Sequence, residues 1–194
     1  MAVAVRKKRK DQITHIARNM FRERGYAATT MRDLATTVGI EAASLYSHIE
    51  SKESILQQIC FTMAEQFMEI VTGLEKETLP IEKKLALAIE MHVKVITENT
   101  DASGVFLHDW KHLSEPYLSR FKSMRRKYES FYTNLVEEGH EEGIFKNIDT
   151  KFVVLTLFSA MNWIFDFYKP SGKMQPKEIA GHVTDLILNG LKNN

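Results

Sequence analysis

Residues 42–48 bring alanine side chains together with hydroxyl, phenol and imidazole groups in one short segment. These polar groups form hydrogen bonds to phosphate oxygens and to base edges, and alanine suits the methyl group of thymine. No arginine, asparagine or glutamine lies in the segment, so part of any sequence recognition would depend on DNA shape. We expect six residues to contact DNA here: Ala42, Ala43, Ser44, Tyr46, Ser47 and His48.

Two short helices and a tight turn are predicted to position this segment. Thr30 is a typical N-cap, and Asp33 follows three residues later, as in a capping box. Gly39 can end the first helix in the left-handed conformation, and Leu45 and Ile49 would face inward from the second. The pattern predicts a helix-turn-helix whose second helix enters the major groove, with Thr30 directing its backbone N–H or hydroxyl to a phosphate.

The flanking residues strengthen this interpretation. An upstream segment has the apolar spacing of a one-faced helix and ends at Gly25, and Ser51 can cap a further helix downstream. Over residues 10–56 the chain resembles the DNA-binding domain of the TetR family of bacterial repressors. The matching residues are Ala17, Phe21, Gly25, Tyr26, Thr30, Ala35, Gly39, Leu45, Tyr46, His48, Ser51, Lys52 and Glu53.

The resemblance implies an all-α fold of nine helices, with an N-terminal three-helix DNA-binding domain and a C-terminal helical ligand-binding and dimerisation domain. We expect these domains to cover residues 1–52 and 53–194. The resemblance also implies that Tyr46 and Lys52 contact phosphates. Ile49 departs from the family pattern where phenylalanine is usual, and the alanine pair at 42–43 makes the base-reading surface unusually apolar.

Charge is distributed unevenly along the chain. Residues 1–52 hold ten Lys/Arg and five Asp/Glu, whereas the remaining residues hold sixteen and twenty. The basic part therefore coincides with the helix-turn-helix, as phosphate neutralisation requires. We expect residues 1–9 to be a flexible arm, whose basic run at 6–10 either follows the DNA backbone or minor groove or stays a solvated tail. The sequence has no recognisable signal sequence or membrane span, and its single cysteine, Cys60, cannot form an intrachain disulfide. We therefore expect a cytoplasmic protein.

The rest of the chain is predicted to be helical, with a break at residues 100–104. A segment from residue 152 to 168 is apolar on nearly all sides, which predicts burial on two faces. Either this helix is central in a monomer, or it packs with the last helix against a second copy. A homodimer would place two recognition helices about 34 Å apart on a palindromic operator. The expected interface residues are Phe152, Leu155, Trp163, Ile179, Val183, Leu186 and Ile187.

Many aromatic residues of the C-terminal part fit either a core or a ligand cleft. The segment from Arg126 to Phe145 and the one from Asn162 to Gly172 resemble TetR-type regulators that respond to fatty acyl-CoA. The resemblance implies an acyl chain among aromatic side chains, with CoA phosphates near Arg125 or Arg126. A drug-like hydrophobic compound is the alternative effector, and Asn162 can instead satisfy a neighbouring group. The expected ligand residues are His92, Phe106, Trp110, Tyr117, Phe121, Arg125, Arg126, Tyr128, Phe158 and Asn162.

Other chemistry finds little support in the sequence. His108 and His112 have a helical metal-ligand spacing, but no third ligand follows at a diagnostic distance, so a surface pair is the preferred interpretation. There is no phosphate loop or nucleophile elbow, and we expect neither an enzyme nor a cofactor. The sequence thus predicts a ligand-responsive repressor. An architectural DNA-binding protein is the alternative of another class.

Overall fold

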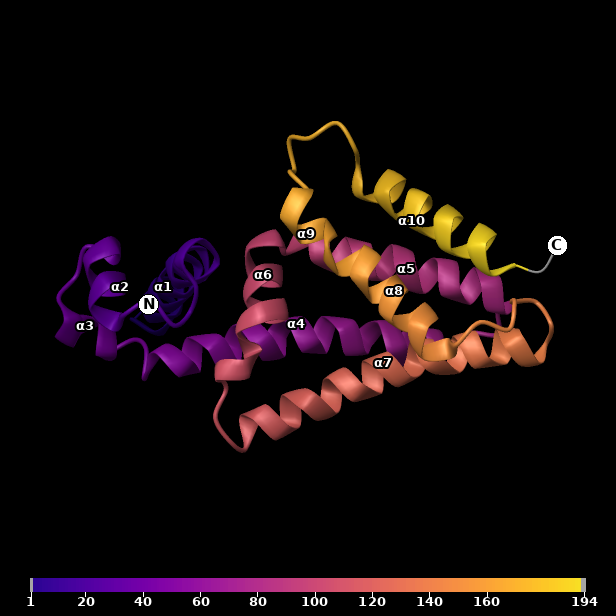
Figure 1. Cartoon of the computed structure of the whole chain (residues 1–194). Coiled ribbons are helices and arrows are strands. Elements are labelled where there is room, and N and C mark those ends of the chain that lie inside the picture. Colours follow the sequence, from indigo (N-terminus) through magenta and orange to yellow (C-terminus); the bar gives the residue numbers. More distant parts are fainter. Residues whose placement is uncertain (1, 193–194) are drawn as a thin grey trace. The chain divides into compact units, whose positions relative to one another are not determined.

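The computed structural model describes residues 2–192, and these are almost entirely helical (Figure 1). The predicted all-α class and its nine helices are confirmed, although the eighth is interrupted at Trp163 and continues as a separate short helix. Residues 2–192 form no named strand, and one isolated bridge pairs Phe145 with Lys192. The elements are α1 (Ala2–Arg24), α2 (Met31–Val38), α3 (Ala42–Tyr46), α4 (Lys52–Leu74), α5 (Ile81–Glu98), α6 (Thr100–His108), the 3-10 helix η1 (Asp109–His112), α7 (Tyr117–Glu141), α8 (Thr150–Asn162), α9 (Ile164–Phe167) and α10 (Pro176–Leu191).

The helices group into two compact units. The first contains residues 2–63 and 101–121, and the second contains residues 64–100 and 122–192. Helices α4 and α7 are continuous from one unit into the other. The division therefore differs from the predicted boundary after residue 52, because α6 and η1 pack with the N-terminal helices.

Helix α1 supplies the core of the first unit and is longer than predicted. Ile13, Ala17 and Phe21 are buried on one face, as their spacing predicts, and Gly25 ends the helix at φ 83°. The helix begins at Ala2 and so includes residues 2–9 of the predicted arm, while Met1 lies outside the described residues. The flexibility of this arm remains a prediction. Residues 2–9 contain neither glycine nor proline and are rich in alanine, lysine and arginine, which favour helix.

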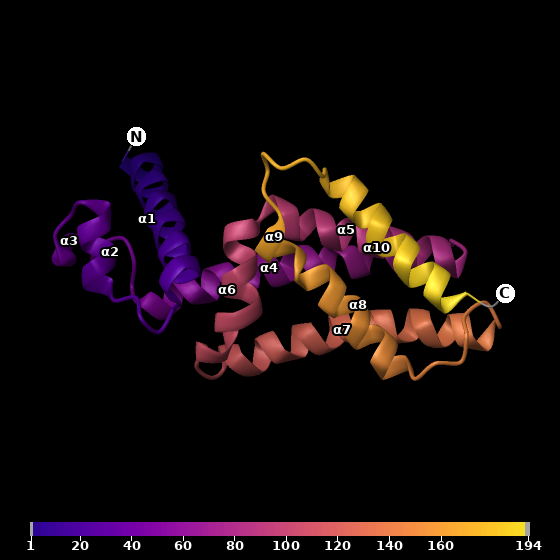
Figure 2. The ribbon, with the colours of Figure 1, turned by 45° about the horizontal axis from the view of Figure 1, so that its top comes forward.

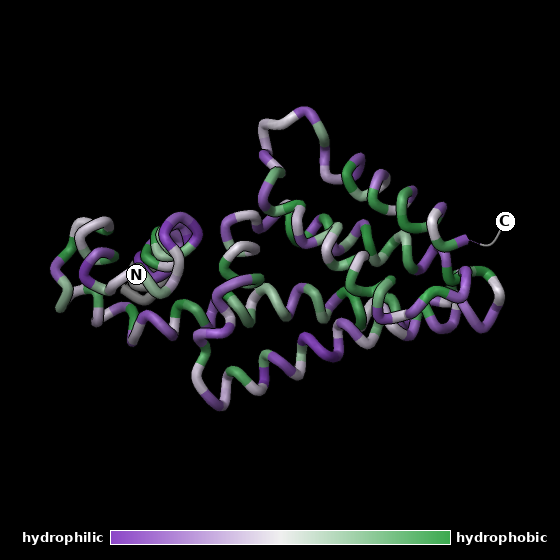
Figure 3. Tube along the Cα trace, in the orientation of Figure 1, coloured by the Kyte–Doolittle hydropathy of each residue, from purple (hydrophilic) through white to green (hydrophobic). Residues whose placement is uncertain are grey.

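The second unit is built around α5, which contacts α8, α9 and α10 (Figure 2). Asp149 caps α8 by accepting a hydrogen bond from the Phe152 N–H at 2.7 Å, and Pro176 is the first residue of α10. Hydrophobic residues recur along both α8 and α10 (Figure 3). None of the helices within residues 2–192 combines the length and apolar character that a membrane span needs.

The predicted break at residues 100–104 is not present. Helix α5 ends at Glu98 with Asn99 as its C-cap, and α6 starts directly at Thr100. Ser103 and Gly104, which suggested a loop, are buried inside α6. Their burial shows why the prediction failed, since close packing in the first unit outweighs the weak helix propensity of serine and glycine.

Candidate functional site

The helix-turn-helix starts with the predicted capping box. Thr30 Oγ1 accepts from the Asp33 N–H at 3.1 Å, while the Thr30 N–H and hydroxyl both donate to Asp33 Oδ2, at 3.1 and 2.6 Å. These bonds, led by the hydroxyl, lower the pKa of Asp33. The capping box uses both donors of Thr30 in this conformation, and a phosphate contact from Thr30 remains a prediction.

Helix α3 exposes the residues that were predicted to read DNA. Leu45 and Ile49 are buried beneath it, while the Tyr46 side chain is 55% exposed. Ala42, Ala43, Ser44 and Ser47 are also exposed, and the Ser47 hydroxyl donates to the Ser44 carbonyl at 2.7 Å. His48 differs, because its ring is half-buried and its Nδ1 is sealed without a hydrogen-bond partner. The remaining five predicted residues thus form one small, weakly polar surface.

Lys52 has a different position from the one expected. Its Nζ donates to the carbonyls of Tyr26 and Thr29, at 2.9 and 2.8 Å, and lies 4.2 Å from the centre of the Tyr26 ring. The ammonium therefore fastens the start of α4 to the turn after α1. A phosphate contact from Lys52 remains a prediction, but in this conformation the charge is already held by two carbonyls.

Residues of η1 and of the loop after it pack near the turn after α1 and the start of α4. The sequence analysis did not predict these contacts. The His112 ring lies 5.2 Å from the Tyr26 ring, and Asp109 accepts a hydrogen bond from the Tyr26 backbone. Glu53 accepts from the Ser114 N–H at 2.8 Å and from its hydroxyl at 3.0 Å. Burial is the main cause that raises the pKa values of Tyr26 and Asp109, whereas the Ser114 N–H lowers the pKa of Glu53. These contacts join positions far apart in sequence, so no local pattern announces them.

The ten predicted ligand residues fall into separate clusters. Phe106, Trp110 and Tyr117 lie with Phe61 and Phe121 in the first unit, where the Trp110 ring stacks on Phe121 at 5.7 Å. His92, Tyr128, Phe158 and Asn162 meet in the second unit. Arg125 is half-buried with Glu129 3.7 Å away, and Arg126 is exposed.

The cluster of the second unit is centred on a buried histidine. His92 Nδ1 lies 3.0 Å from Tyr128 Oη, and its Nε2 lies 3.2 Å from Asn162 Oδ1. Tyr128 Oη is 3.1 Å from Tyr132 Oη, which donates to the Ala88 carbonyl at 3.1 Å. Burial lowers the pKa of His92 to about 3, so the ring is neutral near pH 7. Asn162 thus finds a polar partner inside the protein, which was the alternative to a ligand contact.

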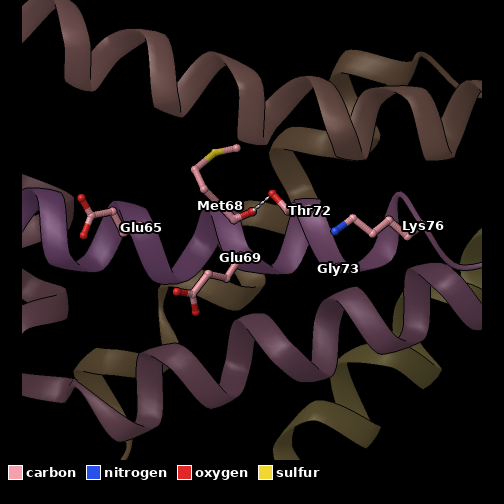
Figure 4. A pocket seen from close by; sticks show the side chains of 6 residues that line it. All are labelled: Glu65, Met68, Glu69, Thr72, Gly73 and Lys76. Atoms are coloured by element: carbon pink, nitrogen blue, oxygen red, sulfur yellow. Dashed lines mark hydrogen bonds between the residues drawn. The ribbon is translucent and has the colours of Figure 1, made fainter.

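A separate shallow groove runs along α4 in the second unit (Figure 4). It is lined by Lys76, just beyond the end of α4, and by five residues of the helix: Glu65, Met68, Glu69, Thr72 and Gly73. None of the predicted ligand residues is among them. The described side chains also contain no group of three or more His, Cys, Asp or Glu residues placed to hold a metal ion.

The predicted dimer residues are mostly uncovered. Phe152 and Trp163 are 66% and 63% exposed, and Leu186 on α10 is 78% exposed. Leu155 is exposed too, while Val183 and Ile187 are half-buried. Ile179 differs from the others, because it is only 5% exposed, and its place in an interface remains a prediction.

Two family models match the chain. Residues 78–191 match the model described as "Tetracyclin repressor-like, C-terminal domain", and residues 13–59 match "Bacterial regulatory proteins, tetR family". The chain belongs to the TetR family. It is therefore a DNA-binding transcriptional regulator and not an enzyme.

Individual members of the TetR family resemble the chain over nearly its full length. The HTH-type transcriptional repressors KstR2 of Mycolicibacterium smegmatis and Rhodococcus jostii are 27% and 28% identical, each covering 94% of this chain, which spans 90% and 91% of theirs. The structure of the ketosteroid transcriptional regulator KstR2 of Mycobacterium tuberculosis superposes with a TM-score of 0.88 at 22% identity, covering 96% of both chains. AibR in complex with isovaleryl coenzyme A and operator DNA has a TM-score of 0.77 at 21% identity, covering 92% of this chain and 97% of AibR. At these identities the two structures establish the fold.

Proposed function

We propose that this TetR-family protein is a homodimeric repressor that leaves a palindromic operator when a hydrophobic effector binds its C-terminal part. The exposed face of α3 above buried Leu45 and Ile49 carries the DNA-binding half of the proposal. Its small side chains can approach base edges closely, and Tyr46 is free to reach a phosphate. The repressors named KstR2 support repression as the outcome.

The operator is found by selecting bound fragments from a random DNA pool and measuring their affinity by fluorescence anisotropy. A dimer should select a palindrome with half-sites about 34 Å apart. Tyr46→Ala should weaken binding about tenfold, whereas the matched change Thr37→Ala, also exposed but on α2, should not. Uniform affinity for all fragments would contradict the proposal and favour an architectural protein.

The dimer is proposed to form through α8 and α10. Phe152, Leu155, Trp163 and Leu186 present large apolar side chains to solvent, and such patches mark interfaces. The double change Trp163→Glu and Leu186→Glu should give a folded monomer in ultracentrifugation that no longer holds the operator. Met174→Glu is the control, because Met174 is exposed but lies in the loop between α9 and α10, away from the end of α8 where Trp163 is found. A variant that remains a dimer would contradict this interface.

For the effector we propose a fatty acyl-CoA. The neighbour AibR, solved with isovaleryl coenzyme A, supports this class, and Arg125 and Arg126 provide cations for CoA phosphates. Native mass spectrometry with acyl-CoAs of graded chain length, followed by operator titration, tests it. Binding that releases the operator supports the proposal. No binding would leave a drug-like hydrophobic compound as the effector class.

A further inference from the structure

The helices that carry the predicted DNA-binding residues have one covalent connection to the rest of the chain. Helices α1, α2 and α3 come first in the sequence, and residues 47–51 join them to α4. A single connection of this kind is a hinge about which the three helices could turn, unless other contacts fix their direction. Lys52 at the start of α4 makes one such contact, because its ammonium donates to the carbonyls of Tyr26 and Thr29.

Helix η1 supplies a second attachment at the same turn, from a distant part of the sequence. Asp109 is half-buried and accepts a hydrogen bond from the Tyr26 N–H. The His112 ring lies 5.2 Å from the Tyr26 ring, at an angle of 31° between the two planes. Tyr26 itself is buried. It therefore connects the turn after α1 both to Lys52 on α4 and to two residues of η1.

Two contacts at the surface widen this attachment. Arg22 near the end of α1 forms an ion pair with Asp101 on α6, and Glu53 on α4 accepts two hydrogen bonds from Ser114. All of these residues belong to the first unit, which includes residues 101–121 as well as the helix-turn-helix. The part of the chain that fixes the direction of α3 is therefore larger than residues 13–59, which match the tetR family model.

The two attachments lead into the second unit along different helices. Helix α4 begins beside the helix-turn-helix, and α7 follows η1 after a short loop, and both continue into the second unit. A group of helices that is held at two points cannot turn freely about either of them. In a dimer formed through the second unit, such an attachment would limit the distance and the angle between the two α3 helices.

We infer that Asp109 and His112 are positioning residues for operator binding, which determine the half-site spacing that the dimer accepts. They act through Tyr26. Each base pair inserted between two half-sites moves one of them by about 3.4 Å and turns it by about 35°, so rigidly held recognition helices fit a single spacing best. The inference rests on the proposed function, because a preferred spacing requires two copies of the chain on a palindrome.

The test measures affinity for the selected palindrome and for versions with one or two base pairs added or removed at its centre. The unaltered protein should bind the best spacing at least about tenfold more tightly than the version lengthened by two base pairs, in which one half-site is displaced by about 7 Å. The double change Asp109→Ala and His112→Ala should weaken binding to the best spacing about 3- to 10-fold, because fewer molecules hold α3 in the competent direction. The preference among spacings should fall below about threefold. Loss of the Asp109 charge would by itself strengthen DNA binding, so electrostatics cannot explain the weakening.

Conservative and matched variants separate positioning from stability. Asp109→Asn with His112→Phe keeps an acceptor and a ring beside Tyr26 and should restore the spacing preference. Lys111→Ala, an exposed change within η1, should leave the preference unaltered. Asp101→Ala breaks an ion pair at the surface and should weaken the preference in the same direction, which decides the matter if the double alanine variant does not fold. Circular dichroism and ultracentrifugation establish that each variant is a folded dimer.

The outcomes distinguish the inference from the proposed function. A folded double alanine variant with the spacing preference of the unaltered protein would overturn the inference and leave the proposed repressor standing. An unaltered protein that shows no preferred spacing would contradict the palindromic dimer, and the inference with it.

Discussion

The helix-turn-helix and the second unit satisfy their polar groups in opposite ways. In the first, Thr30 and Asp33 bond to each other across one helical turn at the surface. In the second, His92 bonds to Tyr128 and Asn162 from two other helices, inside the protein. Water can replace a lost bond at the first site but not at the second. Burial should therefore make the hydrogen bonds of His92 far more sensitive to substitution and pH than the cap at Thr30.

The largest loss of stability is expected from replacing His92, which joins Tyr128 to Asn162. His92→Leu leaves Tyr128 and Asn162 without their partner in a dry environment, and each such group costs about 1–3 kcal/mol. Urea unfolding should show a loss of roughly 2–4 kcal/mol. His92→Gln, which keeps hydrogen-bonding groups, serves as the control and should lose less. Equal losses would mean that packing around the ring, rather than the bonds, sets the stability.

A pH dependence should come from the same residue. His92 has a pKa of about 3 in the folded chain, against an ordinary value near 6.5 when unfolded. Between these values the unfolded state binds the additional proton, so stability is lost as pH falls below about 6.5. The slope is about 1.4 kcal/mol per pH unit. Unfolding series of the unaltered protein and His92→Gln should diverge by about 2 kcal/mol between pH 7 and pH 5, because the full slope is reached only well below pH 6.5. Parallel series would show that His92 is not buried neutral.

A smaller effect is expected at the exposed cap. Thr30→Ala removes the side-chain acceptor of the Asp33 N–H and should cost about 1 kcal/mol. Thr30→Ser keeps the hydroxyl and should stay close to the unaltered protein. A loss as large as that of His92→Leu would break the comparison, because burial would then not determine the size of the effect.

The smallest loss of stability is expected at the contact between Glu53 and Ser114. This contact tests whether burial or separation along the sequence sets the size of the loss. Glu53 and Ser114 are far apart in sequence, yet their contact is exposed. Glu53→Gln should therefore cost less than about 0.5 kcal/mol in urea unfolding. If it costs as much as His92→Leu, long-range connection rather than burial is what makes a contact important here.

Much of the DNA-binding half could be predicted because its signals are local. The cap at Thr30, the turn at Gly39 and the inward positions of Leu45 and Ile49 follow from spacings of a few residues. The apolar face of α1 was equally predictable. Such features depend on backbone geometry within one or two turns, which sequence encodes directly.

Three of the predicted site residues already have partners or neighbours within the chain. Thr30 and Lys52 carry donors that suit phosphate, but the fold supplies internal acceptors for both. Ile179 has the spacing of an interface residue, but its own unit covers it. The acceptor for Thr30 is Asp33 of the same capping box, whereas the acceptors for Lys52 lie more than twenty residues away, where no local pattern includes them.

The sequence by itself determined the all-α class, the helix-turn-helix, its caps and the family, because short-range spacing and turn chemistry specify them. Tertiary structure alone decided that η1 braces the turn after α1, that the predicted ligand residues separate into clusters, and that His92 joins Tyr128 to Asn162. These contacts connect residues tens of positions apart. Their partners depend on which helices pack together and on which polar groups are removed from water. The spacing of residues within one helix encodes neither the packing nor the burial.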